Sequence, residues 1–184
     1  MTFQEKNLQF DFDKNHWTYL LKFDGARDYK NASANLQNTK GVDISGILNK
    51  NSLVLMEVKD YRGHRIKNKP KFTDGQEALW LTTAHKFKDT ISVIVGAARN
   101  STHEKETFQS YLEFLKNEGR ELVFILWLEQ DTPLAKKNRK VKSDRQEYVL
   151  QQKLKRSLKW LTTKVKIIDK STNLFSKSLS VTYI

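Results

Sequence analysis

An apolar run that ends in a carboxylate and an amine is the feature that most constrains the fold of this chain. Residues 53–59 read Leu-Val-Leu-Met-Glu-Val-Lys, and a shorter segment, residues 42–44 (Val-Asp-Ile), lies upstream. Successive side chains of a strand point to opposite faces, so Glu57 and Lys59 point the same way. A charged pair on one face of an apolar strand is costly to bury without a partner. The run therefore predicts a strand whose last residues carry chemistry.

The segment between the two apolar runs has the composition of a tight turn. Strands are expected over about residues 42–48 and 52–60, and residues 49–51 (Asn-Lys-Asn) separate them. Asparagine favours turns because its side chain bonds to the local backbone and tolerates a left-handed conformation. The two strands are therefore expected to form an antiparallel hairpin.

Length and composition limit the class of protein. The chain has 184 residues, of which 38% are hydrophobic, so we expect a single domain over residues 1–184 with a real core. The absence of cysteine excludes disulfides, thiolate metal sites and cysteine nucleophiles. No apolar stretch approaches the roughly 18 residues of a membrane span, and the first residues lack signal-peptide character. We therefore expect a cytoplasmic protein that makes no membrane contact.

Positive charge is concentrated in the second part of the chain. The net charge is +12, yet residues 1–60 hold 8 basic and 8 acidic residues, whereas residues 61–184 hold 25 and 13. A basic field attracts polyanions, of which nucleic acid is the commonest. The alternative is that the charge only keeps the protein in solution.

The rest of the chain reads as alternating helices and strands. Capping residues, apolar periodicity and β-branched runs predict the following order: a helix at 9–22, a polar loop at 24–41, a helix at 74–88, a strand at 90–96, a helix after Ser101, a strand at 121–128, a helix from Ser143 and a strand at 165–168. A hairpin followed by this alternation predicts an α/β fold, with a mixed central sheet and helices on both faces.

The acidic residues of the hairpin are candidate metal ligands. Carboxylates such as Asp43 and Glu57 hold Mg²⁺ (or Mn²⁺), and the backbone carbonyl of Val58 offers a further oxygen. A lysine beside the metal, here Lys59, can orient or deprotonate water or stabilise developing charge. This set of groups is what phosphodiester cleavage needs. The alternative is an ordinary Glu–Lys pair on a half-exposed strand.

The spacing of these residues resembles that of a known family. Val42-Asp43, thirteen intervening residues and then Glu57-Val58-Lys59 resemble the motif of the PD-(D/E)xK nuclease superfamily, which has the restriction-endonuclease-like fold. The resemblance covers roughly residues 10–130, and Val42 stands in place of the proline that names the motif. It implies that Asp43 and Glu57 bind metal and that Lys59 is the catalytic lysine.

Two further family features are sought in the sequence. Many members carry a glutamate on the first helix, but the candidate helix offers only Asp11 and Asp13, and Glu5 lies further out. The number of metal ions is therefore left open. Several members place a glutamine on the helix after the catalytic lysine, and Gln76 with Trp80 resembles that Gln-x-x-x-aromatic pattern. The alternative is that Gln76 is a plain capping-box residue.

Two basic clusters are candidate contacts for phosphate groups. The first directly follows the proposed catalytic strand and consists of Arg62, Arg65, Lys67, Lys69 and Lys71. The second precedes the last long helix and consists of Lys136, Lys137, Arg139, Lys140, Lys142 and Arg145. Contacts of this kind hold the nucleic-acid backbone irrespective of sequence. Both clusters can also be solvated charged surface.

These features together favour a Mg²⁺-dependent nuclease that acts on DNA. Two alternatives remain open from the sequence. One is a catalytically inactive nucleic-acid-binding or assembly module on the same scaffold, and the other is an RNA-directed nuclease. A domain of this size has limited surface for sequence readout, so a homodimer or a targeting partner protein is a further expectation. Endonuclease and exonuclease action are not distinguished.

Overall fold

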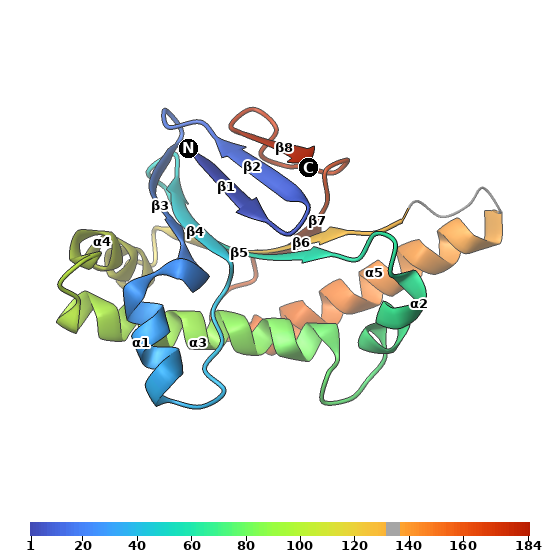
Figure 1. Cartoon of the computed structure of the whole chain (residues 1–184), viewed down its shortest axis with the longest axis horizontal. Helices are drawn as coiled ribbons and strands as arrows, with labels where there is room; N and C mark the ends of the chain where they lie inside the picture. The colour runs from blue at the N-terminus through green and yellow to red at the C-terminus, as the bar shows by residue number, and fades with distance from the viewer. Residues whose placement is uncertain (132–136) are drawn as a thin grey trace.

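A mixed five-stranded sheet forms the centre of the molecule. The computed structural model describes residues 1–131 and 137–184, and the sheet has the order β3-β4-β5-β6-β7 (Figure 1). Strand β5 pairs antiparallel with β4 and parallel with β6, and β6 pairs parallel with β7. The strands are β3 (Trp17–Lys22), β4 (Ile44–Leu48), β5 (Ser52–Asp60), β6 (Glu121–Glu129) and β7 (Val165–Ile168).

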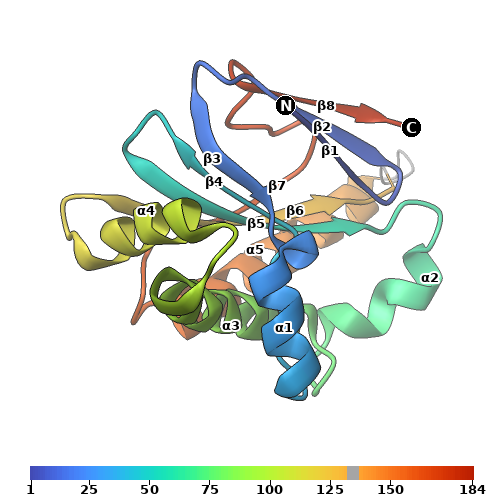
Figure 2. The same ribbon diagram turned by 60° about the vertical axis from the view of Figure 1, so that its left-hand side comes forward.

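A second, smaller sheet lies across one face of the central sheet. It joins β1 (Thr2–Glu5), β2 (Leu8–Phe12) and β8 (Leu179–Tyr183), all antiparallel, in the order β1-β2-β8. Figure 2 shows this sheet above the central strands, with both chain ends beside it. Because β8 comes from the end of the described chain, the first strands are held by residues distant in sequence.

The helices lie against the opposite face of the central sheet (Figures 1 and 2). Helix α3 packs against both α4 and α5. The helical segments are η1 (Phe23–Gly25), α1 (Arg27–Asn35), α2 (Arg65–Asn68), η2 (Lys69–Phe72), α3 (Leu79–Asn100), α4 (Lys105–Lys116) and α5 (Lys137–Leu158).

Two hydrophobic cores lie on the two faces of the central sheet. Leu53 and Leu55 of β5 belong to the core under the helices, whereas Val54, Met56 and Val58 belong to the core under the small sheet. The alternation follows the two-residue period of a strand. It places the next odd-numbered side chains of β5 on the helix side, where the strand emerges from the core.

The mixed α/β character and the hairpin are confirmed. Strand β4 pairs with β5 in antiparallel register, and Asn49 and Lys50 of the turn adopt left-handed φ values of 49° and 55°. The strands predicted at 121–128 and 165–168 are also present, as β6 and β7. The expectation of helices on both faces is wrong, because the small sheet covers the second face.

The helix predicted at 9–22 is wrong. Strand β2 buries Leu8, Phe10 and Phe12 at alternate positions, which is the period of a strand and not of a helix. Asp13 then begins a turn, since its side-chain Oδ1 accepts the N–H of Asn15 at 2.9 Å. The chain continues directly into β3.

The predictions for residues 24–41 and 90–96 also fail in part. The polar segment contains η1 and the helix α1, which has no buried residue. The β-branched run at 90–96 is the continuation of α3, and the predicted strand does not exist. Its burial follows helical spacing, with Thr90, Val93, Ile94 and Ala97 buried. Tertiary packing of this stripe outweighs the β-propensity of the run.

Helix boundaries also differ from the prediction. Helix α3 begins at Leu79 and has no side-chain cap, because its N-cap residue is Ala78. The predicted cap, Thr73, lies before the helix, and its hydroxyl donates to the carbonyl of Pro70. Before α4, the Ser101 hydroxyl does accept the N–H groups of His103 and Glu104, at 3.3 and 3.2 Å. Helix α5 begins at Lys137, earlier than the predicted start at Ser143.

Within the described residues, no helix has the length and apolar character needed to cross a membrane.

Candidate active site

Backbone hydrogen bonds from β5 and η1 hold Asp43 in place. Its N–H donates to the carbonyl of Met56 on β5 at 3.1 Å, and its carbonyl accepts the N–H of Phe23 at 2.9 Å. The preceding N–H, that of Val42, donates to the hydroxyl of Thr90 on α3 at 3.0 Å. Asp43 therefore extends the edge of β4 at a position determined by three separate elements.

The side chain of Asp43 reaches the end of β5. Its Oδ2 accepts the N–H of Val58 at 2.6 Å, and the residue is 6% exposed. The paired register of β4 with β5 stops at Ile44 and Met56, so Val58 lies beyond the ladder on that edge. The N–H and C=O of one strand residue face the same edge. The Val58 carbonyl therefore faces the side on which Asp43 lies.

Glu57 is fully buried on the helix side of β5. It is 0% exposed, and its Oε1 pairs with the ammonium groups of Lys59 and of Lys86, the latter at 2.8 Å. Burial and the nearby Asp43 raise the pKa of Glu57, against the opposing effect of the two lysines. The contact between Glu57 and Lys59 agrees with the predicted common orientation of the two side chains. The structure thus brings Asp43, Glu57 and Lys59 together.

Lys86 was not identified from the sequence. It lies on α3, and its ammonium is 2.8 Å from Glu57 Oε1 and 3.5 Å from Asp43 Oδ1. Burial lowers the pKa of Lys86, but the two carboxylates outweigh that effect and the net direction is upward. The available signal was a lysine beside Phe87, within a stripe that is otherwise apolar or small. It lies within the helix predicted at 74–88, but the prediction considered only the face that carries Gln76 and Trp80.

Two more carboxylates approach Asp43 from the N-terminal part of the chain. Carboxylate oxygens of Glu5 on β1, Asp24 on η1 and Asp43 all lie within 4.8 Å of one another. Burial raises the pKa of Asp24. Lys22 holds Glu5 through an ion pair of 2.9 Å. Glu5 was left unassigned in the sequence, and Asp24 was not considered because its segment was expected to be a loop.

The donor set fits a hard divalent cation. Glu57 Oε2 and Asp24 Oδ1 are buried and have no hydrogen-bond partner among the described residues. A buried acceptor of this kind normally has a donor or a cation beside it. Carboxylate and carbonyl oxygens are the ligands that Mg²⁺ and Mn²⁺ prefer. Asp43 and Glu57, with the Val58 carbonyl, therefore suit such an ion, and Glu5 and Asp24 lie close enough to Asp43 to contribute.

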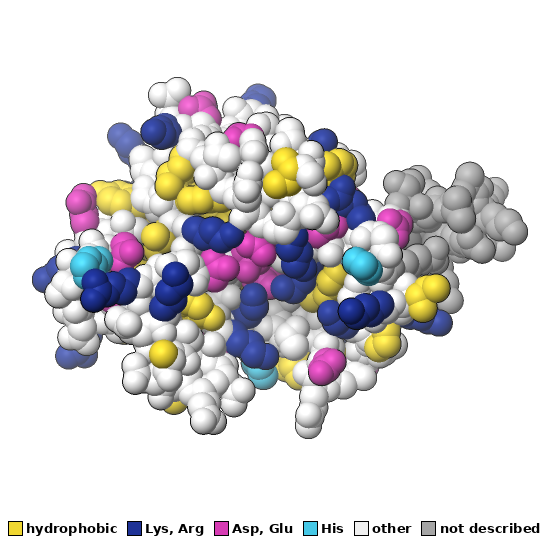
Figure 3. Space-filling model, viewed as in Figure 1, with side chains coloured by type: hydrophobic (Ala, Val, Ile, Leu, Met, Phe, Trp, Pro, Cys, Tyr) yellow, Lys and Arg dark blue, Asp and Glu magenta, His cyan; other side chains and the backbone are white. Residues whose placement is uncertain are grey.

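The rim of this site carries further cations. Lys6 in the β1–β2 turn and Lys71 of η2 lie over the ring of Tyr61, with their ammonium nitrogens 6.0 and 5.2 Å from its centroid. Burial and the negative charge of Glu57 raise the pKa of Tyr61 to about 12. Figure 3 shows Asp and Glu side chains gathered at the centre of this face, with Lys and Arg side chains around them.

The first basic cluster is divided by the structure. Lys67 and Lys69 are exposed, and Lys71 is half-buried at the rim. Arg62 is already engaged, since its Nε and one terminal nitrogen donate to Asp60 at 2.9 and 2.8 Å and its guanidinium lies 3.7 Å from the ring centroid of Tyr183. The side chain of Arg65 lies outside the described part.

The second basic cluster falls largely outside the described structure. Lys136 is not among the described residues, and helix α5 includes the backbone of the rest of the cluster. The described side chains of α5 begin after that cluster. Lys137, Arg139 and Lys140 therefore remain sequence predictions as phosphate contacts.

Gln76 is not brought to the carboxylates. It is exposed in the segment that precedes α3, and no contact in the described residues joins it to Asp43 or Glu57. Helix α3 does supply a polar side chain to the site, but that side chain is Lys86 and not Gln76.

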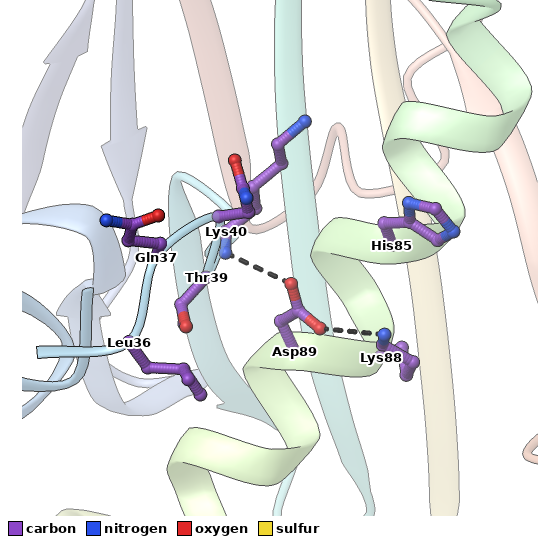
Figure 4. Close-up of a pocket in the computed structure, with 8 residues that line it drawn as sticks. Leu36, Gln37, Thr39, Lys40, His85, Lys88 and Asp89 are labelled. Carbon is purple, nitrogen blue, oxygen red and sulfur yellow. Dashed lines mark hydrogen bonds and ion pairs between the residues drawn. The ribbon is translucent and has the colours of Figure 1, made fainter. Parts of the chain in front are cut away.

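A separate hollow lies between the segment after α1 and helix α3 (Figure 4). It has a volume of about 410 Å³. Asp89 is fully engaged there, because its two oxygens contact the N–H of Lys40 at 3.1 Å and the ammonium of Lys88 at 3.2 Å. This hollow lacks the paired carboxylates of the first site, so it is the weaker candidate.

Comparison with family models, with curated proteins and with solved structures yields no match for the chain. The positions and contacts of Asp43, Glu57 and Lys59 therefore give the best indication of function.

Proposed function

We propose that this protein is a metal-dependent nuclease that hydrolyses phosphodiester bonds in DNA. The observation that carries the proposal is the convergence of Asp43, Glu57 and Lys59 at the carboxyl end of β5, where one buried oxygen of Glu57 has no hydrogen-bond partner in the described part of the chain. Ligands of α/β sheets bind preferentially outside the carboxyl ends of parallel strands, and β5 is parallel to β6 at this point. The arrangement agrees with what the PD-(D/E)xK resemblance implies.

Each acidic residue has a role in this proposal. Asp43 and Glu57 hold Mg²⁺ or Mn²⁺ together with the Val58 carbonyl, and Glu5 and Asp24 extend the oxygen set around Asp43. The bound cation supplies positive charge to the phosphate and makes an attacking water more acidic. Burial keeps the carboxylates of Asp43 and Glu57 at fixed positions, so little reorganisation is needed when substrate arrives.

Lys59 acts on the attacking water. Its ammonium is held by Glu57, two residues earlier on the same strand face, and the side chain remains 22% exposed. An ammonium in this position orients the water by hydrogen bonding and stabilises negative charge as it develops on the phosphate. Lys59 is therefore the residue whose loss should reduce the rate most without removing a cation ligand.

Net positive charge supports DNA as the substrate. Lys71 lies at the rim of the site, and the exposed Lys67 and Lys69 lie just before it in the chain. Such lysines attract the phosphate backbone without reading sequence.

A second Lys–Glu ion pair, distant from the site, offers a control. It joins Lys164 to Glu121 at the other end of the β5–β6 ladder, where Glu121 pairs in register with Ser52.

The test is cleavage of supercoiled plasmid with Mg²⁺ or Mn²⁺. We expect nicking or linearisation by the wild type that is abolished by a chelator. Lys59→Ala should lower the rate by about 100-fold or more, the cost of removing one transition-state donor in other enzymes. Lys164→Ala removes an equivalent lysine from a Lys–Glu pair and should retain the wild-type rate. Equal rates for wild type and Lys59→Ala at matched purity would overturn the proposal.

The same experiment separates the alternatives. Salt-sensitive binding of the plasmid without turnover, and without Mn²⁺ binding in calorimetry, indicates an inactive nucleic-acid-binding module on this scaffold. Cleavage of a matched RNA in preference to DNA indicates an RNA-directed nuclease. The ion pairs of Lys59 and Lys86 with Glu57 make the inactive module the natural second candidate, because they offset the charge of this buried carboxylate without a metal.

A further inference from the structure

Lys86 lies between the two carboxylates that the proposed function assigns to the cation. Its ammonium contacts both Asp43 Oδ1 and Glu57 Oε1, at 3.5 and 2.8 Å. Lys59 differs, because among the described residues its ion pair is with Glu57 alone. Asp43 Oδ2 accepts the N–H of Val58, so the other oxygen, Oδ1, is the one that faces Lys86.

Lysines already offset most of the carboxylate charge around the site. Lys59 and Lys86 offset Asp43 and Glu57, and Lys22 offsets Glu5, which leaves the charge of Asp24. A divalent cation that enters between Asp43 and Glu57 meets the Lys86 ammonium at close range. Like charges at such separation repel strongly when they are shielded from water.

We propose that Lys86 is a built-in competitor for the divalent cation and must leave the two carboxylates before the ion can bind. This inference rests on the proposed function. The side chain is able to move, because it is a flexible four-carbon stem that is 23% exposed and the two carboxylates are its recorded ion-pair partners. The apparent affinity for the cation is reduced by the fraction of molecules in which Lys86 occupies the site.

A structural role for Lys86 predicts the opposite effect on cation binding. If Lys86 only held the site together, its loss would misplace the carboxylates and weaken the binding of the cation. A competitor predicts that the loss of Lys86 strengthens it. The sign of the change therefore distinguishes the two roles without any measurement of activity.

The test is calorimetric titration of Mn²⁺ into the full chain without DNA. Lys86→Met keeps the length of the stem and removes the charge, and we expect its dissociation constant for Mn²⁺ to fall by about tenfold. Lys88→Met, two residues further along α3, removes a lysine that pairs with Asp89 and should bind Mn²⁺ as the wild type does. If circular dichroism shows that Lys86→Met is unfolded, Lys86→Gln takes its place, since an amide still donates to the carboxylates.

Binding that is equal or weaker in the Lys86 variant overturns the competitor inference and leaves the proposed function intact. Absence of Mn²⁺ binding in every variant, wild type included, overturns both.

Discussion

The two side-chain oxygens of Asp43 have different roles, and a single substitution can separate these roles. One oxygen accepts the Val58 N–H at 2.6 Å, which holds the end of β5, and the other faces the cation position. Buried carboxylates accept such backbone bonds strongly because the acceptor is charged. An asparagine retains an oxygen for the N–H but loses the negative charge.

Asp43→Asn should therefore keep the fold and lose the cation. We expect its affinity for Mn²⁺ to fall by at least about 100-fold, since even residues that only hydrogen-bond to a metal ligand are worth about 10–100-fold. The thermal midpoint should change little, because one repulsive charge beside Glu57 is removed along with one ion pair. Asp11→Asn changes a half-buried carboxylate on β2 that accepts hydrogen bonds from Thr2 and Gln9; it is the control and should bind Mn²⁺ normally. Unchanged Mn²⁺ binding in Asp43→Asn would contradict its assignment as a ligand.

Helix α3 organises the site at the element scale. It supplies Lys86 to the carboxylates and Thr90 to the N–H of Val42, the residue before Asp43. It is held against the sheet by Phe87, which stacks on Phe124 of β6 with ring centroids 4.4 Å apart. The same helix therefore fixes both the backbone and the charge of the site.

Thr90→Val tests this arrangement. Valine has nearly the same shape, but the buried N–H of Val42 loses its acceptor, so we expect a loss of about 1–3 kcal/mol in the free energy of unfolding. Mn²⁺ affinity should also fall, because the segment that positions Asp43 is loosened. Denaturant unfolding and calorimetry measure the two effects.

The control for this prediction lies on the same helix. The hydroxyl of Thr82 donates to the carbonyls of Ala78 and Leu79, and no N–H depends on it. Thr82→Val should change stability by less than about 0.5 kcal/mol. Equal effects of the two substitutions would show that the bond to Val42 has no special role.

The hairpin was predictable from the sequence, whereas part of α3 and the strand β2 were not predicted. The β4–β5 hairpin follows from a short turn between two apolar runs, and with it the common orientation of Glu57 and Lys59. Helix α3 was misjudged because the β-branched run from Thr90 favours a strand locally, whereas burial at helical spacing decides its structure. Strand β2 showed the two-residue alternation of Leu8, Phe10 and Phe12, which was available in the sequence and was not used.

At the scale of the whole molecule, the site joins parts of the chain that are far apart in sequence. Glu5 reaches Asp43 because β1 pairs with β2, which in turn pairs with β8 near the end of the described chain. Lys86 comes from α3, which lies on the face of the central sheet opposite the small sheet. Neither neighbour follows from spacing within the sequence, so only the central Asp43–Glu57–Lys59 set could be predicted.

Acidic and basic residues are distributed unevenly along the chain and on the face that contains the site. The first 60 residues are balanced and supply the carboxylates, whereas the later residues carry the whole excess of +12. On the face that contains the site, acidic side chains lie at the centre and basic side chains surround them (Figure 3). A polyanion is attracted to the rim, while the centre retains the oxygens that a cation requires.

The most direct test of the central claim is the anomalous scattering of Mn²⁺ in crystals of the protein soaked with that ion. We expect a peak in contact with both Asp43 and Glu57, with the Lys59 ammonium beside it and Lys86 displaced from the two carboxylates. Crystals that bind Mn²⁺ elsewhere, or not at all, with Lys86 still paired to Asp43 and Glu57, would contradict it.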